Sequence, residues 1–192
     1  MSQCLVFCAG WYQPIKQLDF LKEAWHLTDF YTVDIDPAAG ADLTSDLTDP
    51  LFLASIPPGR FQYIAFLNCS AEGTLFLKRS DGSNVLAVDL LRIFISKVPV
   101  GGSLIIDNLL GVVPFLATYF KLPTRGLRRV ELLAQTSGYI EDATLRLLDG
   151  AEIDPLFVEI TNWLAAQLPG TEVELVLIPG KKLPVVEIMR LG

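Results

Sequence analysis

The feature that most constrains this chain is the alternation of short apolar runs with amphipathic segments through its first half. Leu5–Phe7 is a short apolar run that ends in a tight turn at Gly10, which predicts a buried strand. The segment Pro14–Trp25 carries apolar residues at spacings of three and four, which predicts a helix with one packed face. Phe30–Ile35 is rich in β-branched and aromatic residues and stops before Asp36-Pro37, which predicts a second strand. The order strand, helix, strand is typical of a parallel βα unit.

The same alternation continues along the chain. The acidic stretch Ala38–Pro50 is expected to be a loop. Phe61–Leu67 predicts a further strand, and Asn68–Ser83 after it is expected to be a second loop. Asn84–Val98 predicts a deeply packed helix, because its polar residues fall on one narrow stripe. Leu104–Ile106 predicts the next strand. We therefore expect a parallel sheet with helices on both faces.

The second half of the chain predicts helices at Leu127–Thr136 and from Asp154 to Leu168, and a strand at Ala143–Leu148. Glu172–Ile178 and Val185–Leu191 flank a turn and predict an antiparallel hairpin that closes one edge of the sheet. Together these elements predict one Rossmann-like α/β domain over residues 1–192. Its sheet should be mostly parallel, with about seven strands.

Composition argues against several classes of function. The formal net charge of -7 and the pI near 4.7 disfavour binding to nucleic acid or to an anionic membrane, since both need clustered cations. The apolar run Leu109–Phe120 is broken by Pro114 and is shorter than the roughly 20 residues that span a bilayer. No basic region precedes the first apolar run, so we expect a cytoplasmic protein without a secretory signal. Three cysteines and one histidine offer no metal-ligand spacing, so we expect no metal.

In an open α/β sheet, ligands bind just beyond the carboxyl ends of neighbouring strands. Small residues after the first strand would let a ligand approach the backbone near the start of a helix. Asp34 and Asp36 lie at the end of the second strand, where a carboxylate can accept both hydroxyls of a ribose, and Asp34 is the better candidate. We expect Asp46 beside an adenine amine and Leu47 over the ring. The candidate ligand-binding residues are Cys8, Ala9, Gly10, Trp11, Asp34, Ile35, Asp46, Leu47, Asn68 and Cys69.

The same residues have a structural interpretation, and no catalytic residue can be assigned. Glycine is common at strand-to-helix turns, and aspartate is common at turns before proline. Cys69 could be a nucleophile, but the only histidine, His26, lies in the region of the first helix, so a lining or structural role is the stronger interpretation. Glu72 could act as an acid or base. Catalysis therefore stays unassigned.

Five segments, taken in order, resemble the motifs of one known family. Leu5–Gly10 resembles a glycine-containing first motif, and Tyr31–Asp49 resembles an acidic motif with its adenine loop. Phe61–Leu67 resembles the fourth-strand motif, and Asn84–Asn108 resembles the helix, glycine pair and fifth strand that follow it. Leu132–Leu148 resembles the last helix and sixth strand. The family is the class I S-adenosylmethionine-dependent methyltransferases, and the resemblance covers most of the chain.

This resemblance implies S-adenosylmethionine as the cofactor and a small molecule or a protein as the methyl acceptor. Methyl transfer mainly requires alignment of the reactants, so a missing general base does not exclude it. The chain departs from the family pattern at Cys8 and Tyr12, where glycine is typical, and at Glu72-Gly73, where many small-molecule members have a Glu-His pair.

These departures keep other functions open. The high apolar content, 51% of residues, leaves room for a surface covered by a second copy of the chain or by another protein. The alternative function is therefore a catalytically inactive binding or assembly module on the same fold. A dinucleotide enzyme is the weakest candidate, because the glycine pattern of that class is missing.

Overall fold

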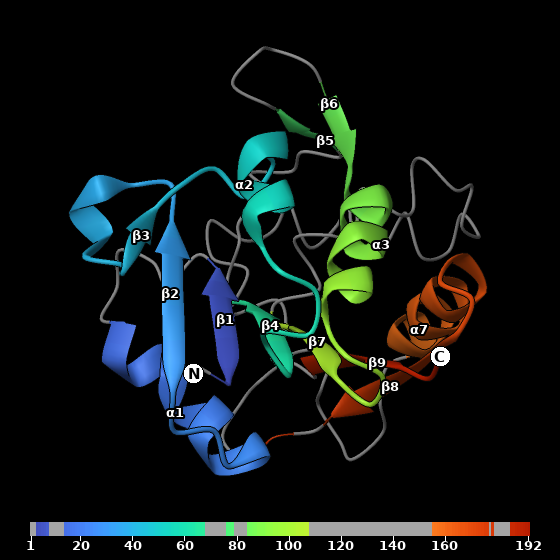
Figure 1. Cartoon of the computed structure of the whole chain (residues 1–192). Coiled ribbons are helices and arrows are strands. Elements are labelled where there is room, and N and C mark those ends of the chain that lie inside the picture. Colours follow the sequence, from blue (N-terminus) through green and yellow to red (C-terminus); the bar gives the residue numbers. More distant parts are fainter. Residues whose placement is uncertain are drawn as a thin grey trace, which may run out of the picture.

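The computed structural model describes residues 3–7, 14–67, 76–78, 84–107, 155–176, 178 and 185–192. Figure 1 shows strands at the centre of the molecule with helices packed around them. The strands among these residues are β1 (Cys4–Phe7), β2 (Phe30–Asp34), β3 (Leu43–Thr44), β4 (Tyr63–Phe66), β5 (Phe76–Lys78), β6 (Asn84–Leu86), β7 (Ser103–Ile106), β8 (Thr171–Val176) and β9 (Val185–Arg190). The helices are α1 (Pro14–Trp25), a 3-10 helix η1 (Pro37–Ala39), α2 (Pro50–Ser55), α3 (Ala87–Lys97) and α7 (Pro155–Gln167).

The main sheet has seven strands in the order β3-β2-β1-β4-β7-β9-β8. The pairs from β3 to β7 are all parallel, and β9 is antiparallel to both of its neighbours, β7 and β8. β5 and β6 form a separate two-stranded antiparallel sheet. The structure thus confirms the predicted fold class, a mostly parallel Rossmann-like sheet with an antiparallel hairpin at one edge.

Each central strand buries both of its faces, because successive side chains point to opposite sides of a sheet. On one side Leu5 and Phe7 belong to an apolar cluster that includes Phe94 of α3. On the other side Cys4 joins a second cluster that includes Leu21 of α1. Helices therefore cover both faces of the sheet, as predicted.

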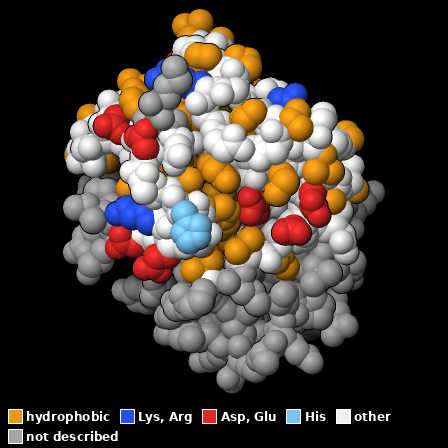
Figure 2. Space-filling view, turned by 60° about the horizontal axis from the view of Figure 1, so that its bottom comes forward, with side chains coloured by type: hydrophobic (Ala, Val, Ile, Leu, Met, Phe, Trp, Pro, Cys, Tyr) orange, Lys and Arg blue, Asp and Glu red, His pale blue; other side chains and the backbone are white. Residues whose placement is uncertain are grey.

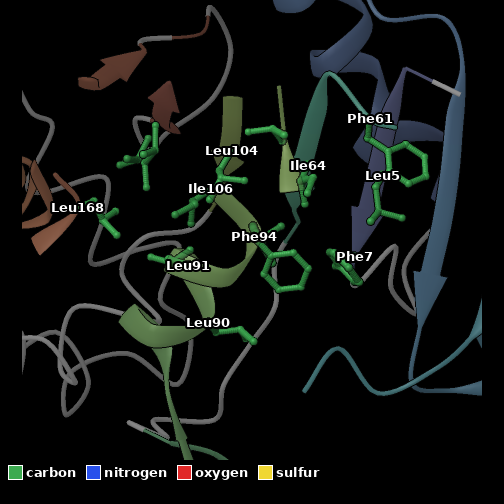
Figure 3. Packing of buried hydrophobic residues seen from close by; sticks show 14 of the residues in the cluster. Leu5, Phe7, Phe61, Ile64, Leu90, Leu91, Phe94, Leu104, Ile106 and Leu168 are labelled. Atoms are coloured by element: carbon green, nitrogen blue, oxygen red, sulfur yellow. The ribbon is translucent and has the colours of Figure 1, made fainter. Parts of the chain in front are cut away.

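Aromatic rings form the centre of the first cluster (Figure 3). The ring centroid of Phe7 lies 5.4 Å from that of Phe66 and 5.1 Å from that of Phe94. The rings of Phe66 and Phe94 meet edge to face at 5.2 Å. Each such pair contributes about 0.5–1.5 kcal/mol beyond the burial of its surface. This contact joins β1 and β4 to α3 directly below the carboxyl ends of the strands.

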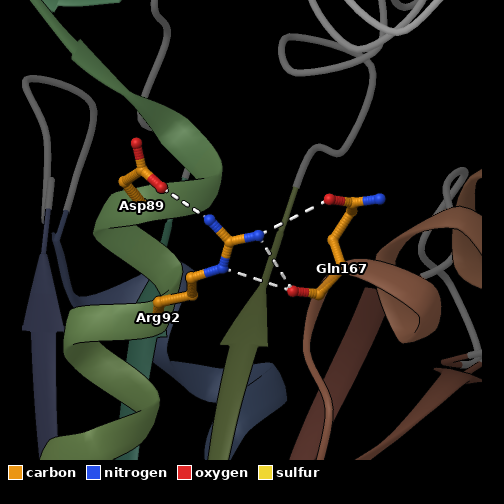
Figure 4. A network of polar contacts seen from close by, with 3 residues as sticks. All are labelled: Asp89, Arg92 and Gln167. Atoms are coloured by element: carbon orange, nitrogen blue, oxygen red, sulfur yellow. Dashed lines mark hydrogen bonds and ion pairs between the residues drawn. The ribbon is translucent and has the colours of Figure 1, made fainter.

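A polar contact joins α3 to the end of α7 (Figure 4). The Arg92 guanidinium donates from Nε and Nη2 to the carbonyl oxygen of Gln167, at 3.3 and 3.2 Å, and from Nη1 to Asp89 Oδ1 at 2.6 Å. Donors at a helix carboxyl end satisfy carbonyls that have no partner within the helix. The Arg92 and Asp89 side chains are 46% and 48% exposed, so their ion pair adds little to stability.

Three local predictions were wrong. The helix predicted from Asn84 begins at Ala87, because Asn84–Leu86 pairs with β5 as strand β6. β5 itself lies inside the predicted loop 68–83. The acidic stretch 38–50, also expected to be a loop, contains β3, which pairs with β2. In each case pairing with a neighbouring strand overrides the local pattern.

Several predicted elements lie outside the described residues. They are the helix at Leu127–Thr136, the strand at Ala143–Leu148 and the turn at 179–182. At the hairpin edge of the described sheet, β8 holds the outermost position.

We predict that Gly102→Ala destabilises the fold. A Cβ atom on Gly102 would lie 2.7 Å from the Gln62 carbonyl oxygen and 2.9 Å from Pro99 Cδ, so the backbone at the start of β7 would have to shift. The free energy of unfolding, measured by urea denaturation, should fall by about 1–3 kcal/mol. Gly192→Ala is the matched control, since a Cβ there meets no atom within 4 Å. Equal stability of the two variants would contradict this packing.

Candidate functional site

The carboxyl ends of the central parallel strands lie at one level. Phe7 of β1 pairs with Val33 of β2 and with Phe66 of β4, and Phe66 pairs with Ile106 of β7. The chain builds β1, β2 and β3 outward in one direction and then places β4 on the other side of β1. In open α/β folds, ligands bind at the carboxyl edge of the sheet beside such a reversal of strand order.

Asp34 occupies this edge as the last residue of β2. Its side chain is buried, with 8% of the residue exposed. Oδ1 accepts a hydrogen bond of 2.9 Å from the backbone N–H of Asp36, which offsets part of the cost of burying a charge. The structure therefore places Asp34 at the end of the second strand, beside β1. The next residue, Ile35, is 68% exposed and presents an apolar side chain at the same strand end.

The loop that carries Asp46 is tied to Asp34. The Asp34 carbonyl accepts a 2.9 Å hydrogen bond from the N–H of Ser45, and Asp34 pairs with Thr44 in the parallel ladder. Asp46 follows directly after Ser45, so the two predicted ligand carboxylates stand at the ends of adjacent strands. Leu47 is partly buried and packs against the first apolar cluster. The structure thus brings Asp34, Asp46 and Leu47 to one end of the sheet.

Thr48 is a residue of this loop that the sequence interpretation missed. It is 2% exposed. Its N–H and its hydroxyl both donate to Asp46 Oδ1, at 2.8 and 2.7 Å. The signal that could have found it is the spacing of aspartate and threonine two residues apart, which is typical of local side-chain turns.

The other aspartates of the acidic stretch have structural roles. Asp36 Oδ1 accepts from the N–H of Ala38 at the start of η1. Asp49 Oδ1 accepts from the N–H of Leu51 at the start of α2. Asp42 Oδ2 accepts from both the N–H and the hydroxyl of Thr32, each at 2.8 Å, where β2 extends beyond the short strand β3. These three carboxylates hold the edge of the sheet together.

Six predicted ligand residues, together with Tyr12 and Glu72, lie outside the described residues. The six are Cys8, Ala9, Gly10, Trp11, Asn68 and Cys69. The described segments end just before them, at Phe7 and at Leu67, whose N–H donates to the Phe7 carbonyl at 3.1 Å. Their contribution to the site therefore stays a prediction.

The single histidine lies at the amino ends of the strands, opposite the ends that carry Asp34. His26 follows the end of α1 and precedes β2, with a left-handed φ of 55°. Figure 2 shows this face, where the histidine in pale blue lies among apolar, basic and acidic side chains. The length of the strands therefore separates His26 from the carboxyl edge. It therefore gives no base to the groups around Asp34.

Two further features bear on the kind of site. Within the described parts of the chain, no three side chains of His, Cys, Asp or Glu gather as metal ligands would. The helices described there are all too short or too polar to cross a membrane.

Comparison with known proteins yields structural likenesses alone. No family model and no curated protein matches the chain. A protein of Methanococcus maripaludis, solved as a candidate S-adenosyl-L-methionine-dependent methyltransferase, matches 98% of this chain and 77% of its own length, at 13% identity and a TM-score of 0.48. The DszA carbon methyltransferase matches all of this chain and 47% of its own, at 16% identity and a TM-score of 0.49. The antibiotic-resistance methyltransferase Kmr matches 97% and 86%, at 13% identity and a TM-score of 0.40.

These likenesses are distant, and the chain spans about half of the DszA enzyme. The fold assignment is made from the sheet itself. Its strand order, with one antiparallel strand between β7 and β8, is that of the Rossmann-like class I methyltransferase fold.

We predict that Cys4 does not react as a thiol in the folded protein. Burial of β1 raises the pKa of the Cys4 thiol to about 12. At pH 8 the thiolate would be about one part in ten thousand, so alkylation by iodoacetamide should be about a thousandfold slower than in urea-unfolded protein. Tandem mass spectrometry of the alkylated chain measures the rate at Cys4. Alkylation of Cys4 at similar rates in folded and unfolded protein would contradict the burial of β1.

Proposed function

We propose that this protein binds S-adenosylmethionine at the carboxyl edge of its sheet and transfers a methyl group to a small molecule or a protein. The observation that carries the proposal is the position of Asp34. A buried carboxylate ends the strand next to the reversal of strand order, which is where a ribose diol is held in nucleotide-binding sheets. The resemblance of five segments to the class I methyltransferases supplies the identity of the cofactor.

The residues at this edge suit the parts of that cofactor. The Asp34 carboxylate would accept hydrogen bonds from the two ribose hydroxyls, and charge-assisted bonds of this kind are the strong ones. Ile35 and Leu47 offer apolar contacts for the adenine ring, and Asp46 would accept from its amino group. Cys8, Ala9, Gly10 and Trp11 would contact the methionine part, and Asn68 and Cys69 would line the centre of the site.

The charge of the edge also fits a cationic ligand. No lysine or arginine occurs between Lys22 and Arg60, a stretch that contains Asp34 and Asp46. A surface with one sign of charge attracts ligands of the other sign and repels phosphorylated ones. S-adenosylmethionine carries a sulfonium and an ammonium group, whereas dinucleotides carry phosphates.

Methyl transfer from this cofactor requires little chemistry from the protein's side chains. When bound, the cofactor supplies an already activated methyl group. The residues of this chain would bind, orient and desolvate the reactants, and alignment alone accounts for much of the acceleration of such a transfer. We propose further that the ligand is a small molecule and that the protein is cytoplasmic, where its three cysteines would stay reduced.

A second candidate is a catalytically inactive module on the same fold, acting in binding or assembly with a second copy or another protein. The observation that favours it is the presence of Cys8 and Tyr12 where the family has glycines. Side chains there would crowd the methionine part of the cofactor.

We predict that Asp34→Ala weakens binding of S-adenosylmethionine by about 1.5–3 kcal/mol, or tenfold and more in the dissociation constant, because hydrogen bonds to a charged acceptor are lost. Isothermal titration calorimetry with S-adenosylmethionine and S-adenosylhomocysteine measures the change. Asp29→Ala is the matched control, since it removes one exposed carboxylate at the amino edge of the sheet. Thermal unfolding of both variants tests whether the fold is intact.

The other outcomes separate the two candidates. No binding by the natural chain, together with binding by a variant that combines Cys8→Gly and Tyr12→Gly, would favour the inactive module. Tight binding that does not respond to Asp34→Ala would contradict both candidates, since the ligand would then lie elsewhere.

A further inference from the structure

The strand β8 forms one edge of the main sheet and is long enough to pair with a further strand. It is six residues long, contains neither glycine nor proline, and pairs with β9 along its whole length. Among the described strands, none pairs with the outer edge of β8, the edge that faces away from β9. The backbone N–H and C=O groups along such an edge can pair with an additional strand.

Alternate side chains of β8 lie in different environments, and this limits the sequence of any strand that is added. Val173 and Leu175 lie on the side of the first apolar cluster and pack against it. Glu172 and Glu174 lie on the opposite side and are exposed. An added strand would therefore need apolar side chains on the first side, and its side chains on the second side would meet carboxylates.

The negative charge on this second side is not neutralised by any lysine or arginine of the described residues. Glu174 lies directly opposite Glu187 of β9, and like charges in that position repel each other. Glu187 accepts a 3.0 Å hydrogen bond from Trp25 Nε1, and none of the three glutamates forms an ion pair in the described part of the chain. The arginine of β9, Arg190, lies on the other side of the sheet and donates to the Val98 carbonyl oxygen at 2.8 Å.

A second copy of β8 fits this edge poorly. Two copies related by a two-fold axis would pair antiparallel, with their apolar side chains on the same side of the sheet. The registers centred on residues 172, 173 and 174 all set glutamate directly opposite glutamate. A basic strand would instead form pairs of opposite charge at the same positions. The charges of this edge therefore disfavour self-association and favour a partner with basic residues at alternate positions.

We propose that the outer edge of β8 binds an extended segment of a basic partner protein, which adds an eighth strand to the sheet and places Lys or Arg side chains beside Glu172 and Glu174. Backbone hydrogen bonds would supply affinity, and the alternate side chains would supply specificity. The formal net charge of -7 favours the approach of such a partner. β8 and β3 lie at opposite ends of the sheet, so this inference does not depend on the proposed cofactor site.

Three synthetic peptides test the proposal on the natural chain by NMR titration. The first is acetyl-Val-Lys-Val-Lys-Val-Lys-amide, the second has glutamate in place of lysine, and the third is the lysine peptide with every backbone nitrogen methylated. The lysine peptide should shift the amide signals of residues 171–176 and slow their exchange with solvent, and the glutamate peptide should do neither. The methylated peptide keeps the charge but cannot donate backbone hydrogen bonds to β8, so it should bind about tenfold or more weakly.

A charge swap on β8 tests the role of the two glutamates. A variant that combines Glu172→Lys with Glu174→Lys should bind the lysine peptide about fivefold or more weakly than the natural chain, and should bind the glutamate peptide instead. Glu23→Lys combined with Asp29→Lys is the matched control, since it changes the net charge by the same amount at exposed residues away from β8. The control should bind the lysine peptide about as well as the natural chain does.

The outcomes separate strand addition from charge attraction and from self-association. If the lysine peptide leaves residues 171–176 unchanged, or if the methylated peptide binds equally well, no strand is added to β8 and the inference is overturned. Equal loss of binding in the charge swap and in its control would also overturn it, because net charge would then account for the attraction. A natural chain that forms dimers through residues 171–176 would overturn it as well, since a second copy would occupy the edge. If circular dichroism shows that the charge swap does not fold, the methylated peptide on the natural chain decides.

Discussion

The parallel register of β2, β1, β4 and β7 is the constraint on which the rest of this structure depends. It aligns Phe7, Val33, Phe66 and Ile106, so that the loops that follow these strands leave the sheet at one level. Parallel strands need crossover connections, and these place α1 on one face and α3 on the other. The cost of ordering the chain is offset mainly by burial of both faces, at about 1.5–3 kcal/mol for each large apolar side chain.

The same register explains why an acidic stretch with little apolar content is well ordered. The Asp34 carbonyl holds Ser45 through the β2–β3 pairing, and Asp42 takes the place of a strand partner for Thr32. Asp36 and Asp49 begin short helices on either side. Four aspartates therefore hold the backbone at this edge of the sheet: Asp34, Asp36, Asp42 and Asp49. The carboxylate of Asp46 is held by Thr48 at the same edge. An edge whose carboxylates accept hydrogen bonds from backbone N–H groups is rigid and negatively charged. Such an edge suits a cationic nucleoside ligand better than a phosphorylated one.

Sequence patterns predicted the elements whose stability is local or whose burial is complete. The runs at Leu5–Phe7 and Leu104–Ile106 are continuous and apolar because both faces of these strands are covered. In α3, the polar stripe of Asp89, Arg92 and Ser96 predicted the side of the helix that faces outward. The patterns failed for β3, β5 and β6, which are two or three residues long and exist because another strand pairs with each of them. For the candidate site, sequence reasoning predicted Asp34 at the end of the second strand, and the structure has it as the last residue of β2. Thr48 was missed because its role depends on burial, which a short polar loop does not reveal.

Backbone amide exchange with and without S-adenosylhomocysteine tests the central claim, that the ligand site lies at the carboxyl edge around Asp34. Residue-resolved hydrogen exchange by NMR should show slower exchange at the amides of Asp36, Ser45 and Thr48, which hydrogen-bond within this edge. The amides of Tyr63 and Gly102, at the amino edge, should not change. Slowing at the amino edge with none between Asp34 and Thr48, at a ligand concentration that saturates binding, would contradict the account.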